Sequence, residues 1–191
     1  MCVYKYYPTF NVHYLLFGYI MDNNESPLQL GAKLKFWYQH FVKGEGTFED
    51  SLKPVAVIST VEDFWAYYQH FKRPTELPVG SYIYLFREDV KPVWEDVHNK
   101  HGGAFILRFE KSKCNRLWED ILLGYVSAKA DTFAYLNGIR LKVKKDFTEI
   151  DFWLGNVEDE KILEACRRWI VGVTTLENYT PLEVIHFNVE E

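Results

Sequence analysis

The stretch from Lys91 to Asp96, KPVWED, places an indole directly beside a carboxylate. Its proline restricts the backbone, so that Trp94 and Glu95 can face one pocket. An indole face attracts a flat cation by stacking and through its quadrupole, and one carboxylate accepts two neighbouring N–H donors. A 7-methylguanine offers both features, a positively charged ring and adjacent N1–H and N2 amino donors. The loop therefore favours a site for a cationic purine; the alternative is that Trp94 fills the core.

A second set of residues could bind phosphate. Cationic and apolar side chains alternate along a predicted strand, which places them on opposite faces; the cations are Arg140, Lys142 and Lys144, and the apolar residues are Ile139, Leu141 and Val143. Lys145 extends the basic run. The alternative interpretation is a solvated strand face above a core.

The elements that must position these residues are mostly strands. Alternating patterns predict strands near 28–38, 55–58, 81–86, 104–110, 138–144, 149–155 and 182–189, the first as an edge of mixed polarity. Helices are predicted at about 61–71, capped by Thr60, and at 113–127 and 158–171. Gly102 and Gly103 are expected to be a flexible pair. Short connections favour an α+β fold, an antiparallel sheet with helices on one face.

Composition limits the function further. A net charge of −5 and a pI near 5.7 argue against a general nucleic-acid binder with many phosphate contacts. Three cysteines without CxxC spacing predict neither disulfides nor a zinc site, and favour a reducing compartment. The apolar run from Tyr14 to Met21 is too short to span a membrane, so no membrane partner is expected.

Residues 1–25 form a tyrosine-rich N-terminal arm, and residues 26–191 form the binding domain. In the arm, Phe10 precedes Leu15 and Leu16 at a spacing typical of anchors on a short helix. The alternative is that the arm docks on the domain's own core.

Four motifs together resemble eukaryotic translation initiation factor 4E, the mRNA cap-binding family. They are SPLQ at 26–29, TVEDFW at 60–65, PVWED at 92–96 with NKHGG at 99–103, and IDFW at 150–153. Their order and spacing match the family over about residues 26–190. The resemblance implies a curved eight-stranded antiparallel sheet with three helices on its convex face.

The resemblance also implies a ligand, the 7-methylguanosine cap. Its base would be held by Phe48, Trp94, Glu95 and Trp153, and its phosphates by Arg140, Lys142, Lys144 and Lys145. Phe48 replaces a tryptophan and offers a weaker π face. Ala104 and Glu149 stand where the family has cations, so we expect altered ligand preference, including acceptance of further methylation on the following nucleotides.

The helical side of the family binds a helix carrying Tyr-x-x-x-x-Leu-Φ, where Φ is apolar, from a scaffold factor of the 4G type or a 4E-binding protein. The residues expected to form this patch are Pro27, Val61, Trp65, Ile121, Leu122 and Leu123. Glu119 stands where the family has leucine, and its burial against a partner is costly unless it is paired. The alternative for Trp65 is plain core, with either Trp65 or Phe64 facing inward. The arm's Phe10, Leu15 and Leu16 resemble the partner motif.

These inferences predict a non-catalytic, cytoplasmic translation factor that binds capped mRNA and needs no cofactor or metal. His98 and His101 could be imagined as metal ligands, but HxxH alone is not a zinc pattern. No P-loop, GxSxG or dinucleotide signature is present. The remaining alternative is a protein-interaction scaffold that keeps the fold and has lost cap binding, favoured by Phe48, Ala104 and Glu149.

Overall fold

The computed structural model describes residues 26–40, 47, 49–174 and 183–187. The arm, Phe48, and the Phe10, Leu15 and Leu16 spacing therefore lie outside the described residues. No helix among the described residues is long and apolar enough to cross a membrane.

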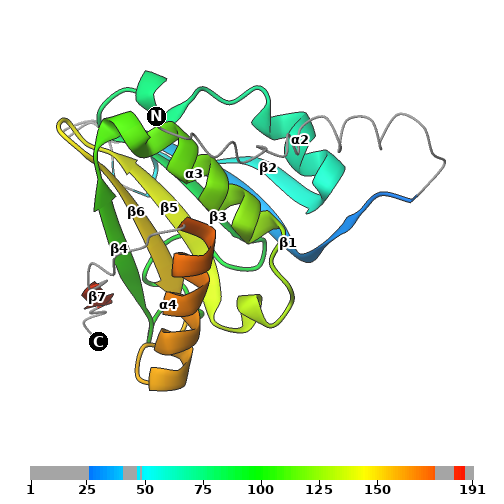
Figure 1. Cartoon of the computed structure of the whole chain (residues 1–191), viewed down its shortest axis with the longest axis vertical. Helices are drawn as coiled ribbons and strands as arrows, with labels where there is room; N and C mark the ends of the chain where they lie inside the picture. The colour runs from blue at the N-terminus through cyan, green and yellow to red at the C-terminus, as the bar shows by residue number, and fades with distance from the viewer. Residues whose placement is uncertain (1–25, 41–46, 48, 175–182, 188–191) are drawn as a thin grey trace, which may run out of the picture.

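A curved antiparallel sheet is the centre of the fold (Figure 1). Its order is β2-β1-β3-β5-β6-β4-β7, seven strands within the described residues, one fewer than the resemblance implies. The strands are β1 (Gln29–His40), β2 (Leu52–Thr60), β3 (Ser81–Arg87), β4 (Gly103–Phe109), β5 (Leu136–Val143), β6 (Thr148–Leu154) and β7 (Glu183–His186). The expectation that the first strand is an edge is wrong, because β1 pairs with both β2 and β3.

Three helices cover the convex face of the sheet (Figure 1), namely α2 (Val61–Tyr68), α3 (Lys111–Val126) and α4 (Glu160–Thr174). Short 3₁₀ turns follow at η1 (Pro74–Glu76) and η2 (Thr132–Ala134). Thr60 caps α2 as predicted, because its side chain accepts from the Asp63 N–H while Asp63 accepts from the Thr60 N–H. The helix ends three residues earlier than predicted, and the chain then turns into η1.

Alternation along β3 separates two cores. Ile83 and Leu85 belong to the large apolar core between sheet and helices. Tyr84 and Phe86 point the other way, into a smaller aromatic cluster that also contains Trp153. Two faces of one strand therefore serve different purposes, since successive side chains alternate across a sheet.

The Gly102-Gly103 pair is packed closely, which corrects the expectation of a flexible pair. A Cβ on Gly102 would lie 2.0 Å from the Leu154 carbonyl oxygen, and one on Gly103 would lie 2.3 Å from the Ile185 carbonyl oxygen. The two glycines are required because the backbones of neighbouring strands approach this closely. This packing fixes where the preceding loop joins β4.

Candidate functional site

A pocket of about 610 Å³ opens on the sheet face opposite the helices. It brings together side chains from β3, β5, β6 and three loops; its lining comprises Thr47, Glu49, Tyr82, Pro92, Val93, Trp94, Glu95, Arg140, Lys142, Lys144 and Trp153. Six of the eight residues predicted to bind the base and phosphates therefore line one concavity. Phe48 lies outside the described residues, and exposed Lys145 is not part of the lining.

The loop that carries Trp94 is held by a buried amide. Asn99 is fully buried, and its Nδ2 donates to the carbonyl oxygens of Lys91 at 3.0 Å and Val93 at 2.8 Å. Asn137 at the start of β5 donates in turn to Asn99 Oδ1 at 3.0 Å and to the His98 carbonyl at 2.8 Å. These bonds tie the loop to the sheet, so the position of Trp94 is set before any ligand arrives.

Asp96 closes the same loop. Its carboxylate accepts from the backbone N–H groups of Lys91 and His98, both at 2.9 Å. Burial opposes ionisation of Asp96, but these donors more than offset it and leave its pKa below the ordinary value. The His98 Nδ1 lies 2.9 Å from Asp96 Oδ1. This histidine therefore has a structural contact, and no group that could hold a metal ion occurs in the described part of the chain.

Trp94 and Glu95 lie at the mouth of the pocket. Trp94 is 55% exposed, and its indole N–H donates to the Glu95 carboxylate. An ion pair between Lys91 and Glu49 connects this loop to the β1–β2 connection. Exposing so large an apolar ring to water is unfavourable unless a ligand covers it. Here a flat ligand can stack on the Trp94 ring beside a hydrogen-bond acceptor, the Glu95 carboxylate.

Trp153 on β6 forms the inner wall of the pocket and is only 3% exposed. Its ring packs against Phe86 at 5.4 Å and Phe187 at 4.4 Å between centroids. Its indole N–H has no hydrogen-bond partner among the described residues. A buried donor without an acceptor is costly, so this N–H is an unsatisfied polar group in the pocket wall.

The cationic strand face is confirmed, with Ile139, Leu141 and Val143 buried on the opposite side. However, Arg140 and Lys142 are already engaged by carboxylates of β6, Asp151 and Glu149. Burial disfavours the charge of Arg140, yet Asp151 overcomes this and holds the pKa of the guanidinium above its ordinary value. Lys144 lies 5.9 Å from the Tyr82 ring centroid.

The sequence analysis missed Asp151 and Asn99 as contributors to the site. The signal for Asp151 was present, because Glu149 and Asp151 alternate with apolar residues in the strand predicted at 149–155. In the hairpin, Arg140 pairs with Asp151 and Lys142 with Glu149. No local pattern indicates that Asn99 is buried, since its partners come from a loop and a distant strand.

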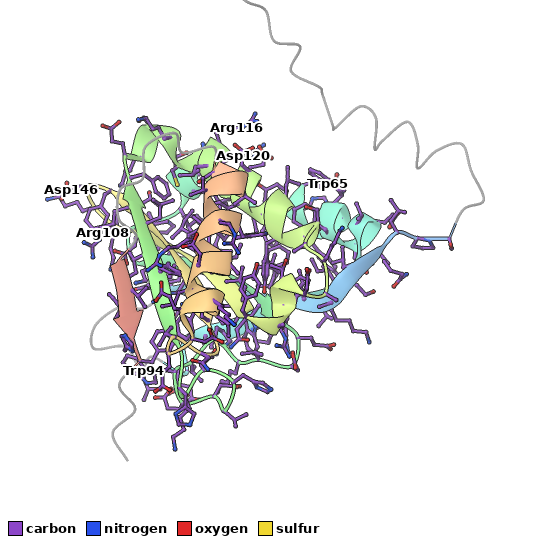
Figure 2. All side chains as sticks on the ribbon, turned by 60° about the horizontal axis from the view of Figure 1, so that its bottom comes forward. Trp65, Trp94, Arg108, Arg116, Asp120 and Asp146 are labelled. Atoms are coloured by element: carbon purple, nitrogen blue, oxygen red, sulfur yellow. The ribbon has the colours of Figure 1, made fainter. Side chains whose placement is uncertain are left out.

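The predicted partner patch is only partly at the surface. Pro27 is exposed, and Val61, Trp65 and Leu123 are half-buried. Of the neighbours Phe64 and Trp65, one was expected to face inward, and it is Phe64 that does so. Ile121 and Leu122 are completely buried in the core, so the expectation that they touch a partner is corrected: α3 directs both toward the sheet. Figure 2 shows Trp65 and Trp94 at well-separated places on the molecule.

Glu119 on α3 forms an ion pair with Arg73, so its partial burial does not leave a carboxylate without a partner. Its Oε1 accepts from Arg73 Nη1 at 3.1 Å, and the Tyr68 hydroxyl lies 3.4 Å from the same nitrogen. Burial, followed by the nearby Glu119 charge, raises the pKa of Tyr68 to about 12. These groups line a hollow of about 70 Å³ together with Trp65, so the helical surface carries an ion pair next to a half-buried indole.

Comparison with known proteins adds an independent line of observation. The family model described as "Eukaryotic initiation factor 4E" matches residues 29–190. The wheat (Triticum aestivum) protein "Eukaryotic translation initiation factor NCBP" is 36% identical over 140 residues, which cover 72% of this chain and 60% of that protein. The chain therefore spans about three fifths of that relative's length.

Two solved structures are also similar. The complex of Ascaris suum eIF4E-3 with m2,2,7G cap has a TM-score of 0.79 at 25% identity and covers 87% of this chain and 94% of that one. The complex of C. elegans eIF4E-3 with the 4E-binding protein Mextli and cap analog has the same TM-score and identity, and covers 84% of this chain and 93% of that one.

Proposed function

The chain belongs to the eukaryotic initiation factor 4E family, and from this premise we propose that it binds the 7-methylguanosine cap of mRNA without catalysing a reaction. The observation that carries this proposal is the single pocket in which Trp94, Glu95 and Trp153 meet. Trp94 stacks on the cationic base, Glu95 accepts from its N1–H and N2 amino group, and Trp153 contacts the methylated side. The similar Ascaris protein was solved with a methylated cap, which supports the assignment.

Stacking and the negative charge of Glu95 distinguish methylated from plain guanine through the positive charge of the methylated ring, because the N1–H and N2 amino donors are the same in both bases. Methylation places a positive charge on the purine, which strengthens its attraction to an indole face. The Glu95 carboxylate gives charge-assisted hydrogen bonds, which are about twice as strong as neutral ones. Phe48 is proposed as the second ring of the sandwich. The loop is preorganised by Asn99 and Asp96, so little entropy is lost on binding.

We further propose that the helical side binds a partner helix of the Tyr-x-x-x-x-Leu-Φ type, carried by a 4G-type scaffold or a 4E-binding protein. Pro27, Val61, Trp65 and Leu123 supply its accessible apolar contacts. The C. elegans relative was solved with a 4E-binding protein, which supports a partner of this class. We propose, from these two surfaces, that the protein acts in translation initiation or its regulation in the cytoplasm.

A second candidate function is a scaffold that binds the partner without the cap. The observation in its favour is the pairing of Arg140 and Lys142 with buried carboxylates, which removes cations from a triphosphate. The two functions differ in what the pocket does, so one binding measurement separates them.

Isothermal titration of the full chain with 7-methyl-GTP and with GTP tests the proposal. Stacking and the carboxylate predict that 7-methyl-GTP binds at least about tenfold more tightly, equivalent to about 1.4 kcal/mol. Equal affinity for the two nucleotides, or no binding of either, overturns cap binding and leaves the scaffold function.

A further inference from the structure

Five charged side chains form one connected network beneath the pocket. Asp151 is fully buried, and its Oδ2 accepts from Arg140 Nε at 2.8 Å and lies 2.9 Å from Lys142 Nζ. Glu149 is 5% exposed, and it accepts from Lys142 Nζ at 2.6 Å and from Arg108 Nε at 2.7 Å. The network therefore runs Arg140, Asp151, Lys142, Glu149, Arg108 across three strands.

The sheet register fixes this network. Arg140 is the cross-strand partner of Asp151, and Lys142 is that of Glu149, in the β5–β6 hairpin. On the other side of β6, Glu149 is opposite Arg108 of β4. Directly opposed residues on one sheet face are held within contact distance by the backbone. The pairing is thus a property of the fold and not of flexible surface side chains.

Arg140 is further held by aromatic rings. Its guanidinium carbon lies 4.9 Å from the Trp153 ring centroid and 5.9 Å from that of Tyr84. Only 16% of the Arg140 side chain is exposed, and only 14% of Lys142. Both cations are therefore fixed in the pocket floor, and moving either one toward a ligand breaks a buried ion pair, which is costly.

The charges in this floor nearly cancel. The network contains three cations and two carboxylates. Of the cations that line the pocket, Lys144 is the one with no carboxylate partner in the described part of the chain. A triphosphate carries several negative charges, so most of them would meet a floor that is already neutralised.

Asp151 has one more property that disfavours phosphate. Its Oδ1 is buried with no hydrogen-bond partner among the described residues, and Asp151 lines a second hollow of about 450 Å³ that adjoins the pocket through Trp94 and Trp153. A free acceptor needs a donor, and an ionised phosphate has only acceptors. Phosphate placed here is therefore repelled by the carboxylate and cannot satisfy it.

We propose that Asp151 and Glu149 act as specificity-determining residues that make this pocket select the methylated base while gaining little affinity from the phosphates attached to it. This inference rests on the proposed cap binding and specifies its ligand class, a 7-methylguanosine group recognised largely independently of polyphosphate charge. The binding is correspondingly insensitive to salt, since few ion pairs with the ligand form.

Titrating the full chain with GMP, 7-methyl-GMP and 7-methyl-GTP at low and high salt tests the proposal. We expect 7-methyl-GTP to bind within about fivefold of 7-methyl-GMP, because a single cation about 4 Å from a phosphate in water contributes about 1 kcal/mol. A gain of about thirtyfold or more from the two added phosphates, with a strong loss at high salt, overturns the inference.

The variant Glu149→Gln keeps the side-chain shape and removes one negative charge from the pocket floor, so that Lys142 keeps Asp151 as its remaining carboxylate partner. We expect it to raise the affinity ratio of 7-methyl-GTP to 7-methyl-GMP about fivefold. Asp120→Asn, which removes the carboxylate of an ion pair with Arg116 on α3, is the matched control and leaves the ratio unchanged (Figure 2). An unchanged ratio in folded Glu149→Gln contradicts the role of Glu149.

Thermal unfolding tests whether Glu149→Gln is folded. If it is not folded, the nucleotide series on the native chain and its salt dependence decide alone.

Failure of this inference differs from failure of cap binding. Equal affinities for GMP and 7-methyl-GMP overturn the proposed function and the inference with it. Discrimination between those two ligands combined with a steep gain from added phosphates overturns the inference only.

Discussion

The two faces of the sheet are built from the same strands by different means. The convex face is covered by helices over a continuous apolar core, and its accessible feature is Trp65 beside the Arg73–Glu119 ion pair. The opposite face carries rings and charges that are held by hydrogen bonds and cross-strand ion pairs. The pocket is thus held in shape by directional polar contacts, whereas the patch around Trp65 is the accessible margin of a core.

Glu95→Ala should have the largest effect, and it acts on the pocket alone. Loss of two charge-assisted hydrogen bonds predicts a decrease of about 100-fold in affinity for 7-methyl-GTP. Calorimetry on the full chain measures this, with Trp65→Ala as the control that keeps native affinity. A Glu95→Ala protein that binds as tightly as the native one would remove Glu95 from the site.

Trp65→Ala tests the helical face and should weaken binding of the partner helix instead of binding of the cap. Truncation of an aromatic anchor typically costs about 2 kcal/mol in an interface, so affinity for a helical peptide carrying Tyr-x-x-x-x-Leu-Leu should fall about thirtyfold. Fluorescence anisotropy of a labelled peptide gives the value. If Glu95→Ala reduces peptide affinity equally, the two surfaces are not independent and the comparison fails.

Asn99→Ala tests whether the Trp94 loop depends on its buried amide. Loss of the Asn99 side chain leaves the Lys91 and Val93 carbonyls without their donor, and we expect a loss of about 2 kcal/mol in the free energy of unfolding. Urea denaturation measures it.

Asn115→Ala on α3 is the control for Asn99→Ala, because among the described residues its amide hydrogen-bonds with Thr75 alone, which is exposed. Equal stability losses in the two variants would show that the loop has no special dependence on Asn99. A larger loss with Asn99→Ala, accompanied by weaker 7-methyl-GTP binding, sharpens the contrast between the polar pocket and the apolar convex face.

The smallest effect concerns pH. Burial raises the pKa of Glu149, but hydrogen bonds and charge interactions with Lys142 and Arg108 lower it by more than burial raises it. The pKa in the folded protein therefore lies below the ordinary 4.5. A depressed carboxylate pKa contributes stability that is present above pH 4.5 and is lost as pH falls through the folded pKa. Glu149→Gln should therefore flatten the dependence of the unfolding free energy on pH in this acidic range. Identical pH profiles for the two proteins would contradict the contribution of Glu149.

Most of the fold followed from local patterns. Alternating patterns predicted the strands β5 and β6 and the cationic face of β5, and Thr60 predicted the start of α2. The position of β1 between β2 and β3, and the close packing of Gly102 and Gly103, did not follow. These features depend on strands that are distant in the sequence.

The sequence by itself determined the residue types that can bind a cationic purine and the four motifs that indicate the family, because these depend on chemical groups and short spacings. Only the tertiary structure decided which cations remain available and which apolar residues reach the surface. Arg140 and Lys142 are compensated by carboxylates across the hairpin, and Ile121 and Leu122 turn into the core. Charge compensation and burial depend on neighbours in space, which no local pattern of residues specifies.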